Sequence, residues 1–385
     1  MEGTTVGSYR IVRKLGEGGM GTVYVGEHVL LGREVAIKVL LPSLSAQNEI
    51  VARFFNEAKA VTRIADPGIV QVFDFGHHVD GSAFIVMELL HGEAMDRRLE
   101  RIGSFAPLAS LRLVRQICAS LVAAHGKGIV HRDLKPENIF IVGDPAVTGG
   151  ERAKILDFGI AKLTSQPAGV TKTRTGMLLG TPVYMSPEQC RGNGEIDARS
   201  DIYSIGCVMM TMLTGRPPFD GEASGDLIVA HLREPPPLAA MRLPGLPEMF
   251  DQILQRCLAK APDDRFPSMA SLVDTLDAAE QAMLRASSST VMALTSPRRV
   301  ATNPTTITHA SGQALAPAVR RRLWPLVATV VFTTGAIVSA VMVRSHGHAA
   351  AIAALSTTTS VGLVPADAAV TVVPVDAAGV DAPEL

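Results

Sequence analysis

The sequence has few of the residues that stabilise small extracellular domains or hold zinc. Its 385 residues include four cysteines and one tryptophan, and no two cysteines have the Cys-x-x-Cys spacing. We therefore expect no disulfide framework, no zinc site of paired cysteines and no dithiol redox motif. The net charge of −1 gives no basic excess, so we expect no nucleic-acid partner. Residues 1–9 contain no long apolar run, and we expect no signal peptide there.

One stretch, residues 131–140, places a carboxylate, an ammonium group and an amide at short fixed offsets. Asp133 can accept a proton from a hydroxyl, Lys135 can neutralise phosphate charge, and the amide oxygen of Asn138 can hold a divalent cation. Apolar, strand-like residues follow. This combination indicates a phosphoryl-transfer site, and the alternative is a charged surface turn before a strand.

A second stretch, residues 15–23, contains the pattern Gly-x-Gly-x-x-Gly at Gly16, Gly18 and Gly21. Residues 22–25 are β-branched or aromatic, so the glycines are expected to join two strands, whereas a dinucleotide-binding fold needs a helix at this point. Glycines let backbone N–H groups approach phosphates without a Cβ in the way. An ordinary glycine-rich hairpin remains the alternative.

Taken in order, these motifs resemble those of bacterial, eukaryotic-like (Hanks-type) serine/threonine protein kinases. Val-Ala-Ile-Lys ends at Lys38, Asp-Phe-Gly begins at Asp157, and Ser-Pro-Glu ends at Glu188. The resemblance covers residues 9–280. It implies an α+β, bilobal fold, with a β-rich N-lobe over residues 9–88 and a helical C-lobe over residues 91–280. It also implies ATP with Mg²⁺ or Mn²⁺, and protein substrates with serine or threonine acceptors.

The apolar pattern predicts the elements that carry these motifs. We expect helices at 49–64 and 108–126, strands at 69–75 and 83–88, and an exposed hairpin tip at 143–152. One departure from the family pattern is Asp-Pro-Gly at residues 66–68, where His-Pro-Asn is common. We expect that departure to lie away from the chemistry.

The resemblance implies a role for each matching residue. Asp133, Lys135 and Asn138 are implied to be catalytic, and Asn138 and Asp157 are implied to hold the metal. Lys38 is implied to orient the α- and β-phosphates and needs a carboxylate to hold it. Glu57, on the predicted helix at 49–64, is the best candidate, and Glu49, at the start of that helix, is the alternative. Met87 would lie behind the adenine, although a simple core role fits it equally well. The nucleotide-binding residues implied are Leu15, Gly16, Glu17, Gly18, Gly19, Gly21, Val23, Ala36, Lys38, Glu57, Met87, Glu88, Leu90 and Phe140.

Residues 160–185 resemble an activation segment that is rich in threonine. Arg132 resembles the arginine that binds a phosphate on this segment, and we predict phosphorylation at Thr171, Thr173 or Thr175. The resemblance also implies two structural contacts. Asp201 is expected to brace the backbone of the catalytic loop, and Arg265 is expected to pair with the glutamate of Ser-Pro-Glu.

Two other functions compete with protein phosphorylation. A pseudokinase would bind the nucleotide as a scaffold without turnover, but the metal, base and phosphate positions are all filled. A small-molecule kinase with a related core would lack the activation segment and its closing motif. Both alternatives are therefore weaker interpretations of this sequence.

Composition changes near residue 285, and no Asp or Glu occurs from there to residue 365. Residues 285–322 are rich in Ser, Thr, Ala and Pro and predict a flexible juxtamembrane linker. Residues 323–343 are uncharged and mostly apolar, and as a helix they would span about 31 Å, which matches a bilayer core of about 30 Å.

The flanking charges predict how this segment is oriented. Three arginines, 320–322, precede it and one arginine follows it, which predicts a single-pass inner-membrane protein with the kinase in the cytoplasm. Gly335 and Ser339 are four residues apart and could pack against a second copy, so a homodimer is a possible partner. Residues 344–385 would be an extracytoplasmic low-complexity tail.

Overall fold

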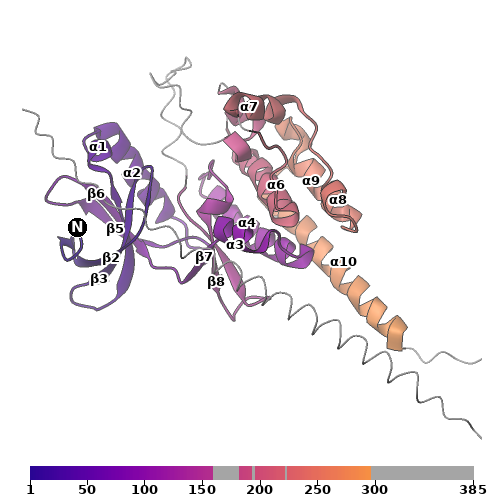
Figure 1. Cartoon of the computed structure of the whole chain (residues 1–385), viewed down its shortest axis with the longest axis horizontal. Coiled ribbons are helices and arrows are strands. Elements are labelled where there is room, and N and C mark those ends of the chain that lie inside the picture. The colour runs from indigo at the N-terminus through magenta and orange to yellow at the C-terminus, as the bar shows by residue number, and fades with distance from the viewer. Residues whose placement is uncertain (159–181, 193–195, 222, 296–385) are drawn as a thin grey trace, which may run out of the picture. The chain divides into compact units, whose positions relative to one another are not determined.

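The computed structural model describes residues 1–158, 182–192, 196–221 and 223–295, with only the backbone described for 287–295. The predicted membrane helix, the tail, most of the predicted linker and the three candidate phosphorylated threonines lie outside these residues. Two lobes are present, one rich in strands and one rich in helices, which confirms the predicted α+β bilobal fold (Figure 1).

The first lobe is built on an antiparallel sheet with the strand order β1-β2-β3-β4-β6-β5. Alternate residues of β4 and β6 point into a core that contains Val35, Ile37 and Val86, all with no exposed surface. The strands are β1 (Thr5–Val6), β2 (Tyr9–Gly18), β3 (Gly21–His28), β4 (Glu34–Leu40), β5 (Val72–His77) and β6 (Ala83–Glu88).

Two helices follow β4: α1 (Pro42–Ser45) and α2 (Asn48–Val61). The buried residues of α2 recur at helical spacing, as the predicted amphipathic helix requires, and all but Val61 join the core cluster with β5 and β6. They are Val51, Phe54, Ala58 and Val61. This packing places Glu57, on the same helix, near Lys38 and Asp157.

A small antiparallel sheet, with the order β7-β8-β9, adjoins the segments that contain Asn138 and Asp157. Its strands are β7 (Gly92–Ala94), β8 (Ile139–Gly143) and β9 (Glu151–Ile155), and the 3₁₀ turn η1 (Pro136–Asn138) leads into β8. The turn between β8 and β9 is where we predicted a hairpin tip. The predicted strand at 69–75 begins only at Val72, because Ile69 forms an isolated parallel bridge with Ile155 instead.

The helices of the second lobe surround α6, of which nearly every residue is buried. Polar contacts fix the position of α4 against α10: Arg112 forms an ion pair with Glu280 at 2.7 Å, and Arg115 forms one with Asp277. The elements are α3 (Met95–Ile102), α4 (Pro107–His125), η3 (Pro182–Tyr184), α5 (Pro187–Arg191), α6 (Ala198–Thr214), α7 (Ser224–Arg233), α8 (Ala239–Arg242), α9 (Glu248–Cys257), η4 (Pro262–Asp264) and α10 (Met269–Thr295).

Two of these helices bear on the predicted membrane anchor and linker. Within the described residues, α4 is the one helix long and apolar enough to cross a membrane, but half of that stretch is buried in the lobe. α10 continues to Thr295 and so includes residues 285–295, which we had assigned to the flexible linker. No proline or glycine interrupts these residues before Pro297, so the helix can continue.

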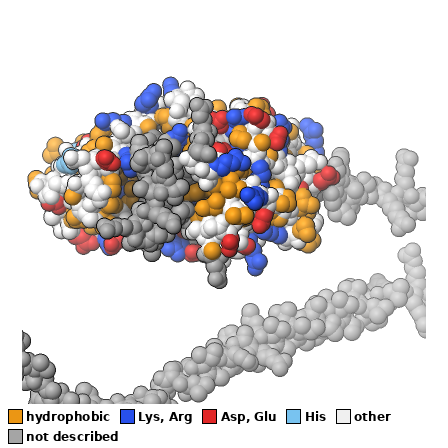
Figure 2. All heavy atoms as spheres, turned by 90° about the horizontal axis from the view of Figure 1, so that it is seen from above, with side chains coloured by type: hydrophobic (Ala, Val, Ile, Leu, Met, Phe, Trp, Pro, Cys, Tyr) orange, Lys and Arg blue, Asp and Glu red, His pale blue; other side chains and the backbone are white. Residues whose placement is uncertain are grey.

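Figure 2 shows one face of the molecule, on which described lysine, arginine, aspartate and glutamate side chains are interspersed. Apolar side chains lie between them. This mixture agrees with the near-zero net charge of the chain.

Candidate active site

The three polar residues predicted to be catalytic lie together on the loop that precedes β8. The Asn138 side-chain amide donates to the Asp133 carbonyl oxygen at 2.8 Å and to its carboxylate at 3.2 Å. Lys135 Nζ lies 4.0 Å from the same carboxylate. The loop therefore presents a carboxylate whose position is set by an amide and whose charge is partly balanced by an ammonium group.

Asp201, at the start of α6, braces this loop from inside the lobe. Its carboxylate accepts the backbone N–H groups of His131 and Arg132, each at 2.8 Å, and lies 2.8 Å from His125 Nε2. Arg132 has a left-handed backbone with φ of 66°, a strained conformation for this residue type that the Asp201 bond helps to hold. The predicted bracing by Asp201 is thus present.

The segment that carries Asp157 is tied directly to the catalytic loop. The Leu156 N–H donates to the Asn138 carbonyl oxygen at 2.8 Å, and the Leu156 carbonyl oxygen lies 3.0 Å from His131 Nε2. Phe158 is fully buried and packs against the His131 ring at 4.7 Å. These contacts fix the distance between the two predicted metal-binding residues, Asn138 and Asp157.

Lys38 reaches this site from β4. Its Nζ lies 2.7 Å from Asp157 Oδ2, across 119 residues of sequence. Burial acts to lower the pKa of Lys38, but the charge and hydrogen bond of Asp157 outweigh it and raise that pKa. The same contact lowers the pKa of Asp157 against the opposing effect of burial. Both groups are therefore charged at neutral pH.

The structure differs from the sequence prediction on the partner of Lys38. Among the described residues Lys38 forms its ion pair with Asp157 and none with Glu57. Burial, and next the charge of Asp157, raise the pKa of Glu57 to about 8, although Lys38 opposes this. Asp157 has taken the ammonium group, so the half-buried Glu57 holds its proton at neutral pH.

The predicted glycine hairpin lies between β2 and β3, where Gly18 pairs with Gly21. A Cβ on Gly21 would lie 2.1 Å from the Val39 carbonyl oxygen, so only glycine fits against the neighbouring strand. A Cβ on Gly16, Gly18 or Gly19 would meet nothing within 4 Å. The first glycines therefore leave an open backbone surface, and the last one keeps the hairpin close to β4.

The other residues that we expected around the nucleotide lie on the adjoining strands. Ala36 pairs with Met87 across β4 and β6, and Met87 also packs on the core cluster under α2, so both of its predicted roles remain compatible. Val23 pairs with Lys38. Glu17 forms an exposed ion pair with Lys14, Leu15 is exposed, Leu90 follows β6, and Phe140 lies on β8 opposite Ala94 and Lys154.

Asp66 to Gly68, which we expected to lie away from the chemistry, contacts the strand that leads to Asp157. The Gly68 carbonyl oxygen accepts the Ile155 N–H at 2.7 Å. Asp66 accepts a hydrogen bond from Ser120 Oγ at 2.6 Å, and a Cβ on Gly68 would lie 2.1 Å from that Oγ. The departure from His-Pro-Asn is therefore matched to Ser120 on α4.

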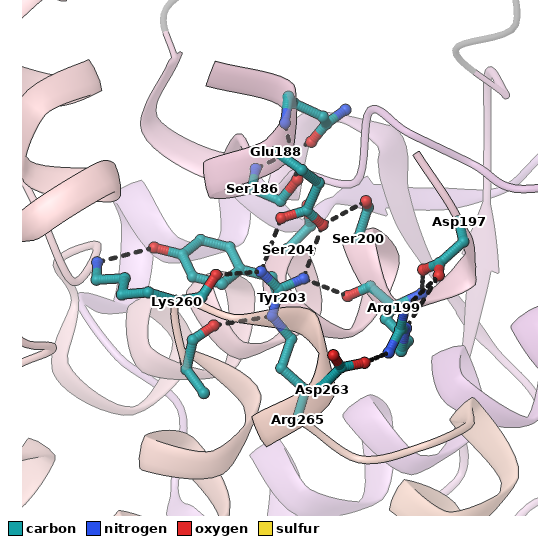
Figure 3. Close-up of polar contacts among 12 residues, drawn as sticks. Ser186, Glu188, Asp197, Arg199, Ser200, Tyr203, Ser204, Lys260, Asp263 and Arg265 are labelled. Atoms are coloured by element: carbon teal, nitrogen blue, oxygen red, sulfur yellow. Dashed lines mark hydrogen bonds and ion pairs between the residues drawn. The ribbon is translucent and has the colours of Figure 1, made fainter. Parts of the chain in front are cut away.

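Glu188 and Arg265 form the predicted pair, shown in Figure 3. Arg265 Nη1 and Nη2 donate to the two carboxylate oxygens at 2.7 and 2.8 Å, and Ser200 Oγ donates to the same carboxylate at 2.6 Å (Figure 3). Burial acts to raise the pKa of Glu188, but the hydrogen bonds and charge of Arg265 lower it to about 2. α5 is connected to the catalytic loop by Gln189, whose amide donates to the Arg132 carbonyl oxygen at 2.7 Å.

Arg132 is suited to bind an anion. Its Nε is buried without a hydrogen-bond partner among the described residues. Burial lowers the pKa of Arg132, and the charge of Asp201 only partly opposes this. Its Nη2 donates to the Ile196 carbonyl oxygen at 3.4 Å. The threonines that we predicted as its phosphorylated partners lie outside the described residues.

The donor set fits magnesium. The Asn138 amide nitrogen is bonded to Asp133, which leaves its amide oxygen to face a cation, and Asp157 offers a carboxylate. Within the described residues no group of three His, Cys, Asp or Glu could enclose a metal alone. Mg²⁺ is usually held by one or two carboxylates with substrate phosphates completing the shell, so two protein oxygens suffice.

Comparisons with known proteins match the part of the chain that contains this site. A family model described as Protein kinase domain matches residues 9–275. The chain is 42% identical over 280 residues to the serine/threonine-protein kinase Pkn1 of Myxococcus xanthus, covering 72% of this chain and 39% of the relative. It is 38% identical over 284 residues to PknD of Mycobacterium tuberculosis, covering 72% of this chain and 41% of the relative. The chain thus spans less than half the length of these two relatives.

A solved structure shares the fold. The PknI kinase domain of Mycobacterium tuberculosis has a TM-score of 0.56 at 29% sequence identity, and the match covers 72% of this chain and 98% of that domain. This likeness agrees with the two-lobed fold described above.

Proposed function

This chain belongs to the protein kinase family, and we propose that it transfers the γ-phosphoryl group of ATP to serine and threonine hydroxyls of proteins. One observation carries the proposal: Asp133, Lys135 and Asn138 on one loop lie beside Asp157, which in turn contacts Lys38 from the other lobe. Family membership implies the use of ATP and a divalent metal. The residue roles below are our assignment.

Each polar group has a place in this reaction. ATP lies beneath the hairpin of Gly16, Gly18 and Gly21, whose open backbone surface admits phosphates. Asp133 accepts the proton of the acceptor hydroxyl and aligns it, and Lys135 balances charge on the group being transferred. The remaining nucleotide contacts are assigned to residues on or next to the strands of both lobes: Leu15, Val23, Ala36, Met87, Glu88, Leu90 and Phe140.

Asn138 and Asp157 would hold Mg²⁺. When bound, the metal neutralises charge on the phosphate oxygens. The protein's share is to hold these two oxygens at a fixed separation, which the Leu156 to Asn138 bond supports. Lys38 contacts the α- and β-phosphates, and we assign Glu57 as its partner during turnover, when it would carry a negative charge.

The test compares Asp133→Asn with wild type in the purified full chain. We expect kcat to fall by at least about 100-fold, the usual contribution of a positioned base, while nucleotide affinity stays within about twofold. Full activity in Asp133→Asn would remove this residue from the mechanism. A wild-type chain that binds ATP and never transfers phosphate would indicate the pseudokinase alternative. Transfer to small alcohols or aminoglycosides but not to a generic basic protein would indicate the small-molecule alternative.

We also propose that phosphorylation of the activation segment switches the enzyme on. The Nε of Arg132, buried without a hydrogen-bond partner among the described residues, supports this, because a phosphothreonine would supply an anion for it. Substituting Thr171, Thr173 and Thr175 together with alanine should lower activity at least tenfold. Unchanged activity in that triple variant would refute the switch.

Finally, we propose that residues 323–343 anchor the kinase to the inner membrane, with the lobes in the cytoplasm and residues 344–385 outside. The length of the segment and the arginines at 320–322 support this. The chain should remain with membranes after alkaline extraction, and the lobes should resist protease added outside intact cells. Gly335 and Ser339 make a homodimer through this segment part of the proposal.

A further inference from the structure

A partly buried ion pair joins the two lobes. Lys154 Nζ, on β9, donates to both carboxylate oxygens of Glu88, at the end of β6, with distances of 2.8 and 2.7 Å. Lys154 is 9% exposed and lies between the buried residues Ala153 and Ile155. Lysine is seldom buried to this extent without a specific partner, because its ammonium group must leave water.

The pair lies where two parts of the nucleotide site meet. Glu88 is the residue at which β6 ends, and its backbone is part of the assigned adenine end. Lys154 precedes Asp157 by three residues on the segment that carries the assigned metal-binding carboxylate. A single ion pair therefore connects the adenine end of the site with its phosphate end.

Backbone bonds make this connection stiff on both sides. The Glu88 N–H donates to the Gln71 carbonyl oxygen at 2.8 Å, so its backbone is held while Lys154 holds its side chain. On β9, the Ile155 N–H donates to Gly68 at 2.7 Å and the Ile155 carbonyl oxygen accepts from Val70 at 3.1 Å. Residues 68–71 thus lie between the two partners and are bonded to both strands.

We propose that Lys154 is a positioning residue for the nucleotide. Its ammonium group binds the Glu88 carboxylate and does not contact the nucleotide itself. Through Glu88 it sets the position of the adenine-contacting backbone relative to Asp157. This proposal rests on the proposed function, which assigns the site to ATP and a divalent metal. Without the pair, the end of β6 relaxes toward solvent, and the adenine and metal ends of the site lose their fixed separation.

The test substitutes Lys154→Met and Glu88→Gln in the purified full chain. We expect KM for ATP and the dissociation constant of Mg·ADP to rise about tenfold, the size of one lost charge-assisted hydrogen bond. KM for the protein acceptor should stay within about twofold. The reversed pair, Lys154→Glu with Glu88→Lys, should recover most of the nucleotide affinity. Arg112→Met is the matched control, because it breaks a partly buried ion pair between α4 and α10 in which neither Lys154 nor Glu88 takes part.

A merely structural role gives a different pattern. Lys154→Met would then lower Tm as Arg112→Met does, with nucleotide affinity unchanged in the folded fraction, and the proposal would be wrong. If Lys154→Met does not fold, Glu88→Gln and the reversed pair still decide, since wild-type affinity in Glu88→Gln overturns the idea. Binding of Mg·ADP is measured without turnover, so a failed phosphotransfer assay in the wild type would refute the proposed function and leave this test intact.

Discussion

The Arg265→Met substitution should lower the free energy of unfolding by more than the loss of any surface ion pair among the described residues. The Arg265 side chain has no exposed surface, and besides Glu188 it donates to three backbone carbonyl oxygens, those of Arg199, Ala259 and Lys260. Arg265→Met would leave the Glu188 carboxylate buried and without its cation. Breaking a buried pair in this way typically costs about 3–5 kcal/mol.

The pKa of Glu188 supports a similar magnitude. Its fall from 4.5 to about 2 corresponds to about 3 kcal/mol of folding free energy near neutral pH. Because the folded pKa is the lower one, this contribution is present above about pH 4.5 and is lost as the pH falls toward 2. For a domain of this size, a loss of 3 kcal/mol would lower Tm by roughly 6–12 °C.

The assay is thermal or urea unfolding of the full chain at pH 7 and at pH 4, with Arg199→Met as the control. Arg199 pairs with Asp197 and Asp263 at the surface, where such pairs contribute about 1 kcal/mol or less. At pH 7, Arg265→Met should lose much more free energy of unfolding than Arg199→Met. The difference between the two losses should be smaller at pH 4. Equal losses in the two variants would show that the Glu188 pair contributes no more than a surface contact.

Three further predictions concern single positions in the two lobes. Gly21→Ala should raise KM for ATP at least about fivefold and lower Tm, because its Cβ would lie 2.1 Å from the Val39 carbonyl oxygen; unchanged kinetics would show that the hairpin shifts without cost. Gly206→Ala should cost about 1–3 kcal/mol in urea unfolding, because its Cβ would lie 2.7 Å from Cys257 Cβ in the core, and wild-type stability would contradict the packing described for α6 and α9. Glu57 has a raised folded pKa of about 8, so its favourable contribution is present below pH 4.5 and is lost as the pH rises to about 8. Glu57→Gln should therefore be more stable than wild type at pH 8, by more than about 1 kcal/mol, and equal to it near pH 4, while a constant difference across this range would refute the assignment.

The parts of the site that the sequence predicted well are those set by short offsets. Asp133, Lys135 and Asn138 lie close together in the sequence. Their proximity in space therefore follows from the local geometry of the loop. The hairpin at Gly18 and Gly21 was likewise predictable, because β-branched residues follow it directly.

Contacts between distant segments were harder to predict. The partner of Lys38 depends on how closely α2 and the Asp157 segment approach it and on the protonation of Glu57, and neither is encoded in a local pattern. The Lys154 pair with Glu88 spans 66 residues and follows no motif that we identified. A lysine between Ala153 and Ile155, just before Asp157, was the signal available in the sequence.

Helix ends were the other source of error. The Ser- and Thr-rich composition after residue 285 predicted a flexible linker, yet α10 runs through Thr295. Helix propagation adds one hydrogen bond per residue at little cost once the helix exists, and packing against α4 provides the start. The amino-acid composition after residue 285 does not reveal that the helix continues.

The central claim is that this site moves a phosphoryl group from ATP to a protein hydroxyl. The most direct measurement incubates the purified wild-type chain with Mg²⁺ and ATP labelled on its γ-phosphate, followed by phosphoamino-acid analysis of the chain and of an added basic protein. We predict label on threonine and serine, and none when Asp133→Asn replaces the wild type. Wild-type chain that binds the nucleotide but leaves every polypeptide unlabelled would contradict the account.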